Sequence, residues 1–163
     1  MTLLGLVSDT HGYLDPRLLE AFRGVDAILH AGDVGNHAVL EGLREIAPLY
    51  AVHGNNDAAL DNLGLPKHLD ATFDGVEVHL IHELPHARPS EHTRIVVFGH
   101  SHRQLNEWRD GVLYVNPGAA GRRGFHRLQT AALLRIEAGQ PTVEQLTLGP
   151  RLARPQRPRK GSG

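Results

Sequence analysis

The stretch TLLGLVSDTHG, residues 2–12, decides the fold class, because an apolar run leads directly into a polar turn. An uninterrupted apolar run of this length is typical of a strand buried on both faces, as in a parallel sheet. Similar runs follow at 26–31 and 48–54, with helical patterns between them. Strands that alternate with helices predict βαβ units with right-handed crossovers. We therefore expect an α/β fold with a βαβ-type N-terminal half.

The two helical patterns connect these strands. The first helix is expected to begin at Asp15, a residue suited to the N-cap, with Pro16 in the first helical position. It should carry Leu19 on its apolar face and end at Gly24. The second helix is expected over 37–46.

The pattern changes in the C-terminal half, where pairs of β-rich runs surround short turns that contain glycine. Such pairs are typical of β-hairpins. This half therefore predicts a β-rich region and two sheets packed face to face. The three pairs lie at 69–82 around Asp74-Gly75, at 106–116 around Asp110-Gly111 and at 128–148 around Ala138-Gly139.

Charge divides the chain into a body and a tail. We expect one domain over 1–148, followed by a basic and disordered tail over 149–163. The last thirteen residues, RLARPQRPRKGSG, hold five basic residues and no acid, whereas the whole chain has a net charge of −1. The body is therefore acidic, which argues against a general nucleic-acid-binding surface.

The composition also restricts the chemistry. The chain has no cysteine, so a metal site would have to use nitrogen and oxygen ligands. No apolar run approaches the roughly 18 residues of a membrane span, and the N-terminus does not resemble a signal peptide. We therefore expect a cytoplasmic protein that does not act in the membrane.

Polar side chains gather where the predicted strands end. In the motif GHSH, His100 and His102 occupy alternate positions and should point the same way. Taken singly, the motifs D-x-H, GD and GNND are more often turns or helix caps, because Asp, Asn and Gly favour such conformations, whereas GHSH is moderately specific. Together they place oxygen and nitrogen donors at one sheet edge, where open α/β sheets carry their sites. The set suits two metal ions bridged by a carboxylate, and its members are Asp9, His11, Asp33, Asn55, His82, His100 and His102.

The order DTHG, GD, GNND, H, GHSH and NPG resembles that of the calcineurin-like metallophosphoesterase superfamily. It is most similar to the branch of small single-domain phosphodiesterases from bacteria and archaea, and the resemblance spans residues 3–148. It implies a two-sheet β-sandwich flanked by helices and a centre of two divalent ions. Mn²⁺ is expected, with Fe, Zn, Ni or Co as alternatives. One ion would be held by Asp9, His11, Asp33 and His102, and the other by Asp33, Asn55, His82 and His100, with Asp33 bridging them.

The resemblance further implies hydrolysis of a small phosphate ester by in-line attack of a hydroxide that bridges the two ions. A phosphodiesterase is expected, and a phosphomonoesterase acting on proteins or nucleotides is the alternative. A non-catalytic scaffold, as in the retromer complex, uses the same fold with altered ligand histidines. The intact ligand set favours an enzyme. A homo-oligomer is compatible with the sequence.

Some positions depart from the superfamily pattern. Asn56 stands where many members carry a histidine that protonates the leaving group, and Ala119 replaces the serine of an NPGS motif. The connection from His82 to His100 is short for this branch, so its usual helix is not expected. Candidate phosphate contacts are Asn55, Asn56 and His53. The remaining histidines expected in packing or surface roles include His30, His68, His79, His86, His92 and His126.

Overall fold

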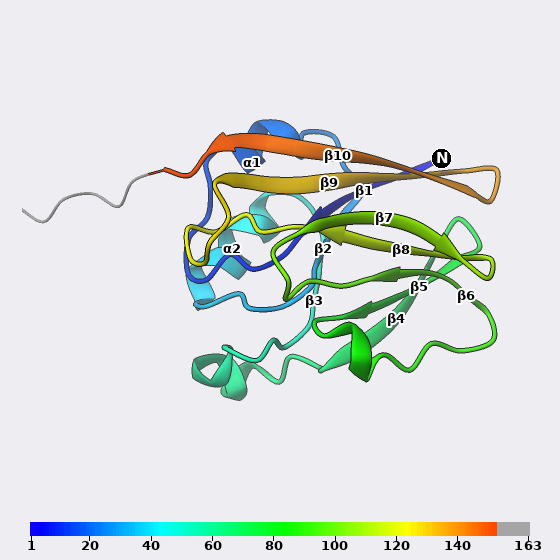
Figure 1. Ribbon diagram of the computed structural model, residues 1–163, viewed down its shortest axis with the longest axis horizontal. Helices are drawn as coiled ribbons and strands as arrows, with labels where there is room; N and C mark the ends of the chain where they lie inside the picture. The colour runs from blue at the N-terminus through cyan, green and yellow to red at the C-terminus, as the bar shows by residue number, and fades with distance from the viewer. Residues whose placement is uncertain (153–163) are drawn as a thin grey trace, which may run out of the picture.

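Two five-stranded sheets form the protein in a computed structural model that describes residues 1–152 (Figure 1). The first sheet contains β1 (Thr2–Val7), β2 (Ala27–His30), β3 (Leu49–Ala51), β9 (Leu128–Glu137) and β10 (Gln140–Pro150), in the order β10-β9-β1-β2-β3. The second contains β4 (His68–Phe73), β5 (Val76–Ile81), β6 (Thr93–Val97), β7 (Gln104–Arg109) and β8 (Val112–Pro117), in the order β4-β5-β6-β8-β7.

The first sheet confirms the predicted βαβ half. β1 pairs with β2 in parallel, with Leu4 beside Ala27, and β2 pairs with β3 in parallel. The helices α1 (Arg17–Ala21) and α2 (His37–Ile46) connect these strands. The hairpin β9–β10 extends the sheet on the other side of β1, and its pairing with β1 is antiparallel.

All three predicted hairpins form, and they turn where the sequence indicates. Asp74, Asp110 and Ala138 have positive φ angles of 48°, 49° and 50°, and each precedes a glycine that also has positive φ. Two successive residues with positive φ are the requirement of the tight turn that suits the twist of an antiparallel pair. In the second sheet, β5, β6 and β8 are parallel to one another.

The hydrophobic core lies between the two sheets. Leu4 and Leu6 of β1 face it together with Leu80 of β5 and Ile95 of β6, all fully buried. Alternate residues of the first sheet, such as Val7, point to the opposite face and pack under the helices. Burial on both faces explains why β1 is an uninterrupted apolar run.

Several expected boundaries differ from the structure. The helix α1 begins at Arg17, so its N-cap is Pro16 rather than the expected Asp15, and Asp15 Oδ1 accepts a hydrogen bond from the Arg17 backbone N–H at 2.9 Å from one position further out. Leu19 is 63% exposed, so its placement on the apolar face was wrong. The third strand is confined to Leu49–Ala51, shorter than the expected 48–54, because the chain turns toward the site after Val52.

The C-terminal boundary is also corrected. β10 continues through Pro150, so Gly149 and Pro150 belong to the sheet rather than to a tail starting at 149. The expected disorder of the rest of the tail concerns residues 153–163, which lie outside the described residues. Within residues 1–152, no helix is long and apolar enough to cross a membrane.

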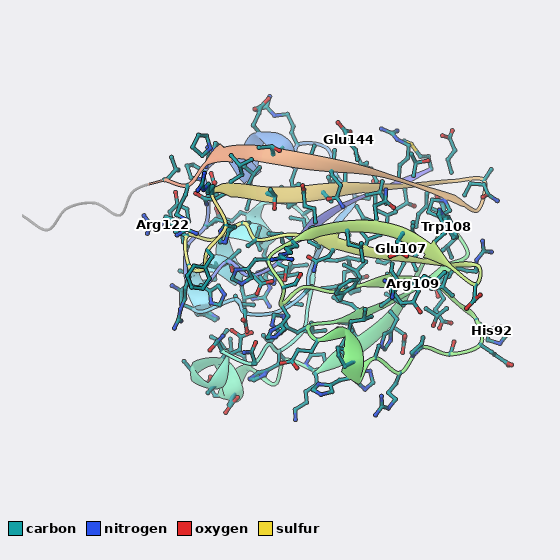
Figure 2. All side chains as sticks on the ribbon, viewed as in Figure 1. His92, Glu107, Trp108, Arg109, Arg122 and Glu144 are labelled. Carbon is teal, nitrogen blue, oxygen red and sulfur yellow. The ribbon has the colours of Figure 1, made fainter. Side chains whose placement is uncertain are left out.

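The parallel strands of both sheets end at the same end of the molecule, on the left of Figure 1. Figure 2 shows Arg122 at this end, whereas His92 and Trp108 lie toward the opposite end. Between β5 and β6 the chain forms one short 3₁₀ helix, η2 (Leu84–His86), as the short spacing predicts. A second 3₁₀ helix, η1 (Ala58–Leu63), follows β3.

Candidate metal centre

The loops that follow the parallel strands meet and bring the expected donors together. The Asp9 backbone N–H, after β1, donates to the Gly32 carbonyl after β2 at 3.0 Å. The Gly99 N–H, after β6, donates to the His82 carbonyl after β5 at the same distance. Each of these hydrogen bonds joins two loops of one sheet, and the His100 N–H, which donates to Asp9 Oδ2 at 3.0 Å, connects the two sheets at this edge, as the clustering of donors at strand ends predicts.

The ligand atoms divide into two groups around Asp33. On one side, Asp9 Oδ1 lies 3.2 Å from His102 Nε2 and 3.7 Å from His11 Nε2. Asp33 Oδ2 lies 3.6 Å from His11 Nε2 and 3.4 Å from His82 Nε2, so it stands between the groups. This position is the one that a bridging carboxylate requires.

The histidine rings show the same division. The rings of His11 and His102 are 5.5 Å apart, and those of His82 and His100 are 5.2 Å apart. His100 is exposed and reaches the cluster through its ring and through its backbone N–H, which donates to Asp9 Oδ2 at 3.0 Å. The expected ligands therefore all lie at this centre, with His100 at its exposed rim.

Asp9 leaves one carboxylate oxygen without a partner. Its Oδ2 accepts from Ser8 Oγ at 2.6 Å and from the His100 N–H, whereas its buried Oδ1 has no hydrogen bond. His11 Nε2 is buried beside it and also has none. A buried polar atom without a partner costs about 1–3 kcal/mol. A cation at this point would satisfy both atoms, so the residues fit a metal ion.

In the second group, the side chains of His82 and Asn55 face each other. His82 Nδ1–H donates to the Ala31 carbonyl at 2.7 Å, which leaves the lone pair of Nε2 facing Asn55 Oδ1 at 2.8 Å. Two acceptors at this distance repel each other unless a cation lies between them. When the Asn55 amide is turned over, it donates to His82 Nε2 and, at 3.1 Å, to Asp33 Oδ2. The first orientation suits a metal-bound centre and the second a metal-free one.

The charges of the centre favour cation binding. Burial alone would raise the pKa of Asp9, but the His102 and His11 rings lower that pKa well below its ordinary range. Burial would likewise raise the pKa of Asp33, and His82 and Asn56 lower it. Burial lowers the pKa of His82, yet the Asp33 and Asp9 carboxylates raise it above its usual value. The carboxylates are therefore ionised at neutral pH, the state in which they can bind a cation.

Backbone conformation marks the same residues. Outside the hairpin turns, the non-glycine residues with positive φ in the described part of the chain are all expected ligands, at angles from 46° to 74°. This conformation costs of order 1–3 kcal/mol per non-glycine residue and is concentrated at functional sites. The loops hold their ligands in strained positions, and these ligands are Asp9, His11, Asp33, His100 and His102.

Two glycines allow the loops to approach closely. A Cβ atom at Gly54 would collide with the Asp33 backbone N and Oδ1. A Cβ at Gly99 would collide with Ser8 Oγ and lie 2.7 Å from Asp9 Oδ2. Gly54 of GNND and Gly99 of GHSH are therefore required, because a larger residue at either position would collide with a neighbouring loop and its carboxylate.

Sequence reasoning missed the residues that support the ligands. Asn56 donates from its backbone N–H to Asp33 Oδ1 at 2.9 Å and from Nδ2 to Asp33 Oδ2 at 3.1 Å. Asp57 accepts from the N–H groups of Gly35 and Gly54 at 3.0 and 2.8 Å, which ties two ligand loops together. Both residues belong to the motif GNND: Asn56 orients Asp33, and Asp57 holds the turn.

Three further residues have their contacts defined by the structure. Asn116 of the NPG motif donates to the Gly99 carbonyl at 3.1 Å and so holds the GHSH loop. His53 Nε2 lies 2.8 Å from Asp61 Oδ1, an interaction that engages one ring nitrogen of this candidate phosphate contact. The His126 ring packs edge-on at 5.1 Å from the ring of His102. His126 therefore has the expected packing role, and it packs against one of the expected metal ligands.

The comparison with family models agrees with the fold and the centre. The calcineurin-like phosphoesterase superfamily domain matches residues 2–139. This chain belongs to that superfamily. The family implies divalent metal ions, and two groups of close ligand atoms occur here, Asp9 with His11 and His102, and Asp9 with Asp33 and His82.

Two curated relatives come from Methanocaldococcus jannaschii. A probable metallophosphoesterase is 29% identical over 134 residues, which cover 72% of this chain and 67% of the relative. A phosphodiesterase is 26% identical over 136 residues, which cover 71% of this chain and 82% of the relative.

Two solved structures show the same fold. An archaeal phosphodiesterase superposes with a TM-score of 0.75 at 24% identity, covering 89% of this chain and 100% of its own. Vps29 from Entamoeba histolytica in complex with Zn²⁺ gives a TM-score of 0.70 at 17% identity, covering 91% and 100%. At these identities the similarity establishes the fold alone.

Proposed function

We propose that this protein is a phosphodiesterase that uses two divalent ions, with Mn²⁺ as the preferred metal, to hydrolyse a small phosphate ester in the cytoplasm. The observation that carries the proposal is the set of lone pairs without donors. Asp9 Oδ1 and His11 Nε2 are buried without a hydrogen bond, and Asp33 Oδ2 stands between two histidines. Oxygen and imidazole donors without thiolate suit Mn²⁺ and similar borderline or hard ions.

Two divalent ions bound here would polarise a phosphate oxygen and lower the pKa of water, so that water attacks phosphorus in line with the leaving group. The residues of the protein hold the metal ligands in their orientations. Asp33 is oriented by Asn56, and the tautomer of His82 is fixed by the Ala31 carbonyl. Such supporting hydrogen bonds keep the ligands in position and set their basicity.

Residues 1–152 offer no obvious proton donor for the leaving group. Asn56 occupies the position of the acid that many superfamily members carry, and its amide is engaged with Asp33. General acid catalysis is typically worth about 10²–10⁴-fold, so its absence should make rates depend steeply on leaving-group acidity. The proposal of a diester substrate is supported by the relative that is named a phosphodiesterase.

The scaffold alternative predicts a different result at the centre. A protein-binding domain has no requirement for buried acceptors without partners, whereas Asp9 Oδ1 and His11 Nε2 are such atoms. This difference favours an enzyme. The fold it shares with Vps29 does not decide the matter, because a fold serves many functions.

The test uses chelated protein reloaded with Mn²⁺ and assayed on two nitrophenyl esters. We expect no turnover after chelation, recovery with about two ions per chain, and faster hydrolysis of bis(4-nitrophenyl) phosphate than of 4-nitrophenyl phosphate. A saturated sample that binds Mn²⁺ but hydrolyses neither ester would contradict the enzyme. Faster hydrolysis of the monoester would replace the diesterase by a phosphomonoesterase.

A further inference from the structure

A cavity of about 590 Å³ opens beside the candidate metal centre. Asn55 and His82 form part of its wall, so it adjoins the side of the centre that these two residues occupy. Its volume lies within the roughly 300–1,000 Å³ of small-molecule sites. The cavity can therefore receive a part of the substrate that extends beyond the reacting phosphate.

Two cationic side chains line this cavity. Lys67 lies immediately before β4, and Arg88 lies in the loop after η2. Among the described residues, neither forms an ion pair with a carboxylate. The Arg88 backbone N–H donates to His79 Nε2 at 3.2 Å, which fixes the loop that presents this cation.

The two carboxylates of the lining are already engaged. Asp61 Oδ1 lies 2.8 Å from His53 Nε2, and Glu83 Oε2 lies 3.5 Å from His86 Nδ1. The Asp61 side chain is 71% exposed, so water screens its charge. Lys67 and Arg88 are themselves exposed and have no carboxylate partner within residues 1–152; Arg88 Nη1 donates to the Ala87 carbonyl at 2.9 Å, which leaves its other nitrogens for a ligand.

We propose that this cavity binds a second anionic group of the substrate through Lys67 and Arg88. The substrate class is then a phosphodiester that carries a further phosphate or carboxylate on one of its substituents. The inference rests on the proposed phosphodiesterase activity and specifies its substrate. Hydrogen bonds between cations and phosphate oxygens are stronger than neutral ones and suit this recognition.

The experiment compares two substrates with the same leaving group. They are thymidine 5′-(4-nitrophenyl phosphate) with and without a 3′-phosphate, assayed with the full chain loaded with Mn²⁺. We expect kcat/KM to be about tenfold higher for the substrate with the 3′-phosphate, mostly through KM, since charged hydrogen bonds contribute about this much. This preference should shrink as ionic strength rises.

The variant Lys67→Gln/Arg88→Gln should reduce the preference to about twofold or less and leave the substrate without the 3′-phosphate unaffected. Its matched control, Arg44→Gln/Arg94→Gln, removes two exposed positive charges that do not line the cavity and should keep the preference.

A binding measurement completes the test. By calorimetry, thymidine 3′,5′-bisphosphate should bind about tenfold more tightly than thymidine 5′-phosphate to the unmodified protein, and equally to the double variant.

The outcomes separate this inference from the proposed function. Equal kcat/KM for both substrates in the unmodified protein, or an unchanged preference in the double variant, would overturn the second-anion site and leave the phosphodiesterase intact. Failure to hydrolyse any diester would overturn the phosphodiesterase. In that case, equal binding of the two thymidine phosphates would overturn the cavity inference, whereas tighter binding of the bisphosphate that depends on Lys67 and Arg88 would support an anion site.

Discussion

Two histidine–aspartate clusters occur in the described part of this protein, and only one has the properties of a metal centre. The first lies at the ends of the strands and is built around Asp9 and Asp33. The second consists of His68, Asp70 and His79 on the hairpin β4–β5. The potential ligand atoms lie within 4.8 Å of one another in the second cluster and in each of the two groups that make up the first, Asp9 with His11 and His102, and Asp9 with Asp33 and His82. Residue type and proximity therefore do not distinguish them.

In the second cluster, the buried histidine His79 has already used both of its ring nitrogens in hydrogen bonds. His79 Nε2 accepts from the Arg88 backbone N–H at 3.2 Å, so the ring proton is on Nδ1, which donates to Asp70 Oδ1 at 2.8 Å. A neutral histidine in this state has no lone pair left for a metal. Asp70 and His79 are direct cross-strand partners, and their contact is an ordinary sheet interaction.

The first cluster is different because its acceptors face one another without donors. Asp9 Oδ1 and His11 Nε2 are buried without a hydrogen bond, and most of its members lie in turns with positive φ. The comparison teaches that unsatisfied lone pairs held by strained loops, rather than the count of histidines, indicate a cation site.

The largest effect should follow from Asp33→Ala. This change removes the carboxylate between His11 and His82, so both ions would lose a ligand and repel each other more strongly. We expect kcat/KM on a nitrophenyl diester to fall by more than about 10³-fold and bound Mn²⁺ to decrease. His102→Ala should be less severe. Asp70→Ala, the matched change in the second cluster, should retain full activity, and equal losses in both aspartate variants would remove the distinction between the clusters.

His30 is a buried histidine with hydrogen bonds at both ring nitrogens, and it should make the free energy of unfolding depend on pH. His30 accepts from the Gly32 N–H at 3.1 Å and donates to Thr10 Oγ1 at 3.0 Å, and burial lowers its pKa to about 4. The unfolded chain takes up this proton near the ordinary histidine pKa of about 6.5, whereas the folded protein does so only near 4. Stability from His30 is therefore complete above pH 6.5 and declines as the pH falls toward 4, by about 3 kcal/mol in total.

Urea unfolding of chelated protein at pH 7.5, 6 and 5 measures this dependence. His30→Gln keeps a donor toward Thr10 but cannot titrate, so its stability should decline less over the same range. An identical decline in both proteins would show that His30 is not the group responsible.

Much of the fold could be predicted because the local sequence patterns agree with the way the strands pair in the structure. The apolar run over 2–7 and the three hairpin turns specify strands that the structure confirms. Leu19 shows where this reasoning fails, because α1 is too short for its helical spacing to decide which side is buried. The end of β10 at Pro150 was missed because pairing with β9, which no local pattern encodes, continues the strand.

The centre could be predicted for a similar reason. Donors that end parallel strands must meet at one edge, so the seven expected ligands come together. Their supporting hydrogen bonds could not be predicted, because they depend on how loops from different strands pack. Asn56 is the clearest example, since its side chain donates to Asp33, a contact that no pattern in the sequence indicates.

An intermediate effect is expected for Asn56→Ala. The variant loses the Nδ2 donor to Asp33 Oδ2 but keeps the backbone donor to Oδ1. Loss of such a supporting contact typically costs about 10–100-fold in metal affinity or activity. Mn²⁺ titration and diester hydrolysis measure it, with Asn62→Ala in the exposed part of η1 as the control. If Asn56→Ala binds Mn²⁺ and turns over like the control, the hydrogen bond to Asp33 has no positioning role.

The smallest effect is expected for Asp70→Asn in the second cluster. The Asn oxygen can still accept from His79 Nδ1–H, and the Asp70 side chain is 47% exposed, so solvent already screens its charge. We expect a change of less than about 1 kcal/mol in the free energy of unfolding, with unchanged diester hydrolysis and Mn²⁺ stoichiometry. Chemical denaturation, metal analysis and the diester assay on the same preparation provide the three readouts. Loss of a bound ion in this variant would mean that His79 can release its proton and that satisfied hydrogen bonds do not exclude a metal here.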